Sequence, residues 1–160
     1  MSLMDNHGTE RRTILLAAGE GKALSMMGDA WTIKAASEET GGSLSVIEAT
    51  FRTQAGPPPH LHRQHEETFY VLDGEFTFQV GERTIRANPG TFVFVPRHVA
   101  HGFRSTGTGP GKLLALFTPG GYEKYFEELA QLPPGPADMN RVLPIFHKYD
   151  NELVGSPPGR

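Results

Sequence analysis

Apolar and polar residues alternate along much of the chain, in short runs separated by residues that favour turns. The longest alternating run covers residues 43–54, and shorter runs cover residues 31–35, 69–72, 76–80, 84–87, 92–95 and 112–118. Successive side chains of an extended chain point to opposite faces, so alternation is typical of a strand with one buried face. Runs that recur about every 8–12 residues indicate an all-β sandwich or barrel.

One of these runs is apolar at every position. Phe92 and Phe94 alternate with Val93 and Val95, which predicts a strand covered on both faces. We therefore expect a core that contains Phe69, Val71, Phe92, Phe94 and Phe103.

The pattern changes period after residue 118. Over about residues 121–132, aromatic and aliphatic residues recur at helical spacing, with Glu123 among the charged residues expected on the solvent face. Residues 142–149 are expected to be a short docked segment, followed by a loose C-terminal tail rich in Pro and Gly. We interpret residues 1–160 as a single domain with a barrel core at about residues 30–118 and a C-terminal helix.

Composition excludes several classes of protein. The chain has 160 residues, 19 Gly and 13 Pro, which fit a turn-rich β domain. A formal net charge of -3 with mixed signs predicts no nucleic-acid or membrane partner. The absence of Cys excludes disulfides, thiolate ligands and Cys nucleophiles. The early apolar run at residues 14–18 is too short for a signal-peptide core, so we expect a cytoplasmic protein.

A cluster of titratable residues lies at residues 60–67, which hold three His and two Glu. His60 and His62 are two positions apart, so both point to the same face of an extended chain. A bend at residues 63–66 would bring Glu67 back to them, and His101 supplies a fourth donor from a later strand. Imidazole and carboxylate donors suit a divalent transition metal such as Fe, Mn, Ni, Co, Cu or Zn.

These segments resemble the two signature motifs of the cupin superfamily. The first motif, HxH followed by Glu and Gly, matches His60, His62, Glu67 and Gly74, and the second matches Gly90, Pro96 and His101. The resemblance covers about residues 30–130. It implies a double-stranded β-helix, or jelly-roll, barrel and one divalent transition metal per chain, held by His60, His62, Glu67 and His101.

The chain departs from the family pattern at three positions outside the ligand set. Gln54 and His98 stand where the family usually has Gly, and Ser105 stands where it usually has Asn. His98 is expected to be an exposed loop residue. We expect Glu66 to be exposed as well, and His65 to lie at the rim of the site, where it could gate a substrate.

Within the cupins, the chain is most similar to small bacterial quercetin-dioxygenase-like proteins. Residues 40–42, 56–62, 67–75 and 116–123 carry this resemblance. It implies a metal-dependent dioxygenase that opens a flavonol or a similar chelating enol, with Glu67 accepting the hydroxyl proton. Two alternatives remain open, namely a non-oxidative isomerase or cyclase of a small carbonyl compound, and a small-molecule-binding cupin without turnover.

The expected partners follow from the same reasoning. The Phe-rich strands favour an aromatic or apolar small molecule over a sugar phosphate, and a dioxygenase would also take dioxygen. By analogy with the family we expect a homodimer, with free strand edges near residues 43–54 available for pairing.

Overall fold

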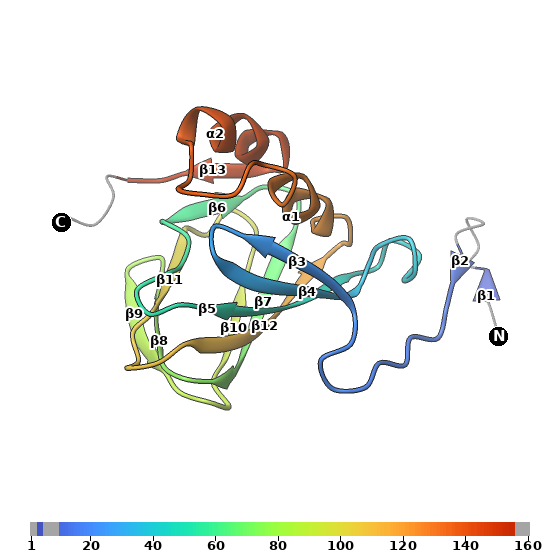
Figure 1. The fold of residues 1–160 in the computed structure, drawn as a ribbon, viewed down its shortest axis with the longest axis horizontal. Coiled ribbons are helices and arrows are strands. Elements are labelled where there is room, and N and C mark those ends of the chain that lie inside the picture. The colour runs from blue at the N-terminus through green and yellow to red at the C-terminus, as the bar shows by residue number, and fades with distance from the viewer. Residues whose placement is uncertain (1–2, 5–9, 156–160) are drawn as a thin grey trace.

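Two antiparallel sheets form a barrel in the computed structural model, which describes residues 3–4 and 10–155 (Figure 1). The six-stranded sheet has the order β10 (Phe92–Val95), β7 (Glu66–Asp73), β12 (Gly111–Thr118), β5 (Ser45–Phe51), β4 (Asp29–Ala35) and β3 (Lys22–Met26). The five-stranded sheet has the order β13 (Asn151–Leu153), β6 (His60–His62), β11 (His101–Ser105), β8 (Phe76–Val80) and β9 (Arg83–Ala87). A separate hairpin pairs β1 (Leu3–Met4) with β2 (Glu10–Arg11). The predicted all-β, jelly-roll architecture is confirmed.

Alternating burial shows how the sequence produces this barrel. In β5, the side chains of Ser45, Ile47, Ala49 and Phe51 are buried, whereas the residues between them are partly exposed. The inward faces of the two sheets meet through aromatic rings, because the Phe103 ring centroid lies 5.1 Å from that of Phe51 and 5.4 Å from that of Phe69. Phe69, Val71 and Phe103 therefore belong to the core, as predicted.

The prediction that Phe92 and Phe94 are buried is wrong. Their side chains are 62% and 51% exposed, whereas Val93 and Val95 face the core. The physical reason is that these two rings lie on the outer face of the sheet, which faces solvent here even on the interior strand β7. Tyr70, which lies opposite Phe92 in the register, is exposed on the same outer face.

The position of β5 also changes one expectation. The strand was expected to offer a free edge for dimer formation, but it is hydrogen-bonded to β4 on one side and to β12 on the other. The edges of the six-stranded sheet are β10 and β3. A homodimer remains a prediction, but β5, the strand within residues 43–54, offers no free edge for it.

Two helices, α1 (Glu123–Leu129) and α2 (Met139–Lys148), follow the barrel strands. Figure 1 shows α2 and β13 together at one end of the barrel, beside β6. The helix expected over residues 121–132 is present and shorter, and α2 covers most of the expected docked segment. The end of the predicted loose tail, residues 156–160, lies outside the described residues. Within the part of the chain that the structure describes, no helix is long and apolar enough to cross a membrane.

The expectation that Glu123 faces solvent is wrong. Its side chain is 1% exposed, and its carboxylate accepts hydrogen bonds from the amide and hydroxyl of Ser37, at 2.8 and 2.7 Å, and from the hydroxyl of Ser45. Burial opposes ionisation, but these hydrogen bonds outweigh it and hold the pKa of Glu123 below its usual value. The buried carboxylate therefore anchors the start of α1 to the barrel.

Candidate metal centre

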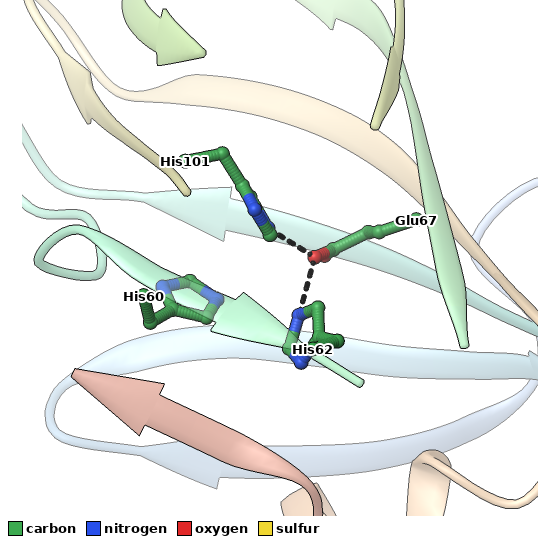
Figure 2. Close-up of side chains that lie close together, drawn as sticks. All are labelled: His60, His62, Glu67 and His101. Atoms are coloured by element: carbon green, nitrogen blue, oxygen red, sulfur yellow. Dashed lines mark hydrogen bonds and ion pairs between the residues drawn. The ribbon is translucent and has the colours of Figure 1, made fainter. Parts of the chain in front are cut away.

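Three strands bring the four predicted ligands together. His60 and His62 begin and end β6, Glu67 is the second residue of β7, and His101 opens β11 opposite His60. One ligand atom from each residue lies within 4.8 Å of the others, and all four side chains are buried. Figure 2 shows the four side chains converging from these separate strands.

Backbone carbonyls orient all three imidazoles. Each carbonyl only accepts, so each Nδ1 carries a hydrogen, and Nε2 is the ring nitrogen left to bind a metal once it carries no proton. The Nδ1–H groups of His60, His62 and His101 donate to the carbonyls of Pro58 at 2.8 Å, Asp150 at 3.2 Å and Val99 at 3.0 Å, respectively.

Glu67 links two of these imidazoles. Its Oε2 atom lies 2.9 Å from His101 Nε2 and 3.0 Å from His62 Nε2 (Figure 2). Burial opposes ionisation of Glu67, but hydrogen bonds to His101 and His62 outweigh it, so the pKa of the carboxyl is far below its usual value. Burial also disfavours a charged His101, yet the hydrogen bond and charge of Glu67 raise the pKa of His101. Burial and the neighbouring His101 lower the pKa of His60 to about 3.

The donor set fits a divalent transition metal. Three imidazole nitrogens and one carboxylate oxygen are ligands that Fe, Mn, Ni, Co, Cu and Zn accept, and they leave coordination positions open for other ligands. His60 is neutral at ordinary pH and Glu67 is ionised, which are the forms that bind a metal.

His65 is not at the rim, where it was expected. Its side chain is 6% exposed, and its ring centroid lies 4.0 Å from that of His62. Nδ1 of His65 lies 3.1 Å from Asp150 Oδ2, and burial lowers the pKa of His65 to about 4. His62, His65 and Asp150 thus form a second group of potential ligands that shares His62 with the first.

Sequence reasoning did not find Asp150. This residue lies 88 positions after His62, in a stretch expected only to dock or to be loose, and no local motif marks it. Its carbonyl contacts His62 of the HxH motif, and its carboxylate contacts the residues that follow the motif.

The other charged and polar residues near the site lie closer to where the sequence predicted them. His98 is exposed, as expected, and Glu66 is partly exposed and pairs with Arg97 at 2.9 Å. Gln54 and His98 have φ values of 69° and 66°, the left-handed conformation that Gly adopts most easily. The two replacements therefore keep the backbone that the family pattern requires.

A cavity of about 380 Å³ lies beside the four residues, and His60 and Glu67 form part of its wall. Most of the remaining wall is apolar and includes the rings of Trp31, Phe51, Phe103, Phe126 and Phe146. A volume of this order suits a small molecule, and such a wall suits an aromatic or apolar one.

A jelly-roll barrel with three His and one Glu converging at a buried point, where they could hold one metal ion, defines a class of β-barrel proteins. Residues 47–117 match the family model of the cupin domain, and the protein belongs to the cupin superfamily.

The chain is similar to quercetin 2,3-dioxygenase from Bacillus subtilis, with 31% identity over 115 residues. The match covers 72% of this chain and 34% of that protein, so the chain spans about a third of its relative's length.

Two solved structures show the same fold. An RmlC-like cupin from Shewanella frigidimarina has a TM-score of 0.58 at 24% identity, covering 68% of this chain and 93% of that one. The polyketide cyclase RemF from Streptomyces resistomycificus has a TM-score of 0.57 at 20% identity, covering 67% of this chain and 80% of that one.

Proposed function

We propose that the protein is a metal-dependent dioxygenase acting on a flavonol-like or other chelating enol substrate. The observation that carries this proposal is the convergence of three imidazoles and one carboxylate at the wall of an apolar, ring-lined cavity. His60, His62, Glu67 and His101 would hold one divalent transition metal. Similarity to a quercetin 2,3-dioxygenase supports the reaction class.

When bound, the metal would supply Lewis acidity and access to dioxygen chemistry. The protein's own groups would bind the substrate, exclude water and accept a proton. The cavity wall would bind the substrate's rings and exclude water, and the ionised Glu67 would accept the substrate hydroxyl proton at a carboxylate oxygen. His60, His62 and His101 would hold their positions because each Nδ1–H is fixed by a carbonyl.

The first experiment measures metal content per chain by mass spectrometry on untagged protein. About one equivalent is expected in the parent and far less in His101→Ala. His98→Asn is the matched control, since this exposed His lies three positions earlier in the loop that leads into β11, Asn tolerates its left-handed backbone, and metal content should stay unchanged. A parent that stays empty after reloading with Fe, Mn, Ni or Co would refute the metal site.

Oxygen uptake then separates the reaction classes. The reloaded protein is given a flavonol, and consumption of dioxygen with product formation is expected. Conversion without oxygen uptake would favour the non-oxidative isomerase or cyclase, because the same ligand set can act as a Lewis acid alone. Binding without any product would favour the small-molecule-binding cupin.

A further inference from the structure

We propose that Asp150 is a positioning residue for the HxH segment, holding the imidazole of His62 in the orientation needed to bind a metal. This inference rests on the proposed metal site and extends it to the C-terminal part of the chain. Residues 150–153 lie outside the stretch that matches the cupin domain.

The segment to be held is short. β6 has only three residues, and its register with β11 consists of the single pair His101 and His60. The chain then bends at residues 63–65 before β7 begins at Glu66. The barrel alone therefore gives this ligand-bearing segment little backbone pairing.

The C-terminal strand supplies most of that pairing. β13 runs antiparallel to β6 with three pairs in register, including Asn151 opposite His62 and Leu153 opposite His60. Asn151 is itself buried and held, because its Nδ2 group donates to the carbonyl of Phe146 at 3.0 Å and its Oδ1 atom accepts from the Tyr122 hydroxyl at 2.6 Å.

Asp150 holds the bend that follows β6. Its carboxylate accepts hydrogen bonds from the amide of Arg63 at 3.1 Å and from the amide of Gln64 at 2.6 Å. The same carboxylate lies 3.1 Å from Nδ1 of His65. Through its carbonyl, Asp150 also accepts from Nδ1–H of the ligand His62 at 3.2 Å. One residue thus contacts four consecutive residues, from His62 to His65.

The backbone of Asp150 is in the left-handed region, with φ of 65°. Gly adopts this conformation without cost, and Asp and Asn tolerate it better than other residues. A Gly at this position would therefore keep the backbone turn and remove the carboxylate. This makes Asp150→Gly a substitution that tests the side chain rather than the fold of the turn.

The matched control is Glu152→Gln. Glu152 lies in β13, two positions after Asp150, and pairs with the side chain of Arg63. Its side chain is 46% exposed, and the contact does not involve the backbone of the bend. Asp150→Asn is the conservative variant. It keeps one acceptor oxygen for the amides of the bend. It replaces the other oxygen with an NH₂ group, which cannot accept a hydrogen bond from the amide of Gln64.

The experiment measures the dissociation constant for Co²⁺ or Ni²⁺ by competition with a chelator. Loss of a group that orients a ligating His weakens metal binding by about 10–100-fold, and we expect a change in this range for Asp150→Gly, a smaller change for Asp150→Asn and none for Glu152→Gln. Equal affinity in Asp150→Gly and Glu152→Gln would overturn the proposal.

A second measurement uses the metal-free protein. In the parent, the Nδ1–H resonance of His62 should be protected from solvent exchange. Asp150→Gly keeps the carbonyl that accepts this hydrogen but frees the amides of the bend, so His62 should shift away from the carbonyl and its Nδ1–H should exchange faster while thermal unfolding stays cooperative. An unchanged resonance would overturn the positioning role. If the parent binds no metal, the proposed function fails, and these spectra still decide the role of Asp150. If Asp150→Gly does not fold, Asp150→Asn provides both readouts.

Discussion

Metal binding should release the proton that His101 shares with Glu67, and this predicts how affinity depends on pH. His101 Nε2 lies 2.9 Å from Glu67 Oε2, and the carboxylate raises the pKa of His101 above its ordinary value of 6.5, despite burial. A metal ion needs the lone pair of the same nitrogen. Raising the pH from 5.5 to 8.5 should therefore strengthen binding until His101 is neutral in the free protein.

His101 contributes one proton to the expected slope. Below the raised pKa of His101, each unit of pH should change the affinity about tenfold, or about 1.4 kcal/mol. His60 adds nothing to this slope, because its pKa is lowered to about 3 and it is neutral across the range. Glu67 adds nothing either, because its lowered pKa keeps it ionised.

The stability of the metal-free protein should follow a different course. The contribution of His101, whose folded pKa is raised, is fully present below about pH 6.5 and is lost as the pH rises through the folded value. His60 and His65 have folded pKa values lowered to about 3 and about 4, so their contribution is present above about pH 6.5 and is lost as the pH falls. These sites together place the stability maximum near pH 6.5, whereas metal affinity keeps rising above it.

Three measurements check this reasoning. Chelator competition gives the affinity at each pH, calorimetry in buffers of different ionisation enthalpy counts the protons released, and thermal unfolding follows the metal-free protein. In Glu67→Gln, the pKa of His101 should fall because the carboxylate is gone, so metal-free stability should no longer decline above pH 6.5. Affinity that is constant between pH 5.5 and 6.5, or binding without proton release, would refute the reasoning.

Three further predictions concern the barrel and its cavity. Phe92→Ser should change the free energy of unfolding by less than about 0.5 kcal/mol, because the ring is exposed, whereas Val93→Ser should cost about 2 kcal/mol or more in chemical denaturation. Glu123→Ala should cost at least about 2 kcal/mol, since it leaves buried donors unpaired. Ala115→Phe should abolish binding of an aromatic ligand with metal content unchanged, because Ala115 lines the cavity, whereas Leu116→Phe on the outer face of β12 should bind normally.

The strands and the ligand cluster could be predicted because both depend on local spacing. Alternation with period two places His60 and His62 on one face, and the bend at residues 63–65 returns Glu67 to them without distant information. His101 could be offered as a fourth donor from a later strand, and the resemblance to a family supported its place in the same ligand set.

The errors have a common cause, which is that contacts between segments far apart in the sequence determine which side chains are buried. An apolar run such as Phe92 to Val95 has the same sequence pattern whether or not another element covers the outer face of its sheet, and here that face leaves two of its rings exposed. Glu123 is buried because Ser37, 86 positions earlier, meets it across the fold. Asp150 likewise reaches His62 only after α2 and β13 have docked.

The net charge of the proposed metal-bound site limits which substrates the cavity would accept, whichever divalent metal is bound. A divalent ion held by three neutral imidazoles and one carboxylate would carry a net charge of +1 in a buried place. The other charged residues of the cavity wall, Asp29 and Arg52, pair with each other at 3.1 Å and leave this charge unbalanced. A buried charge is costly unless it is paired. An enolate would neutralise it, whereas a phosphate dianion would leave an excess negative charge among aromatic rings, so the electrostatics favour a monoanionic, ring-bearing substrate.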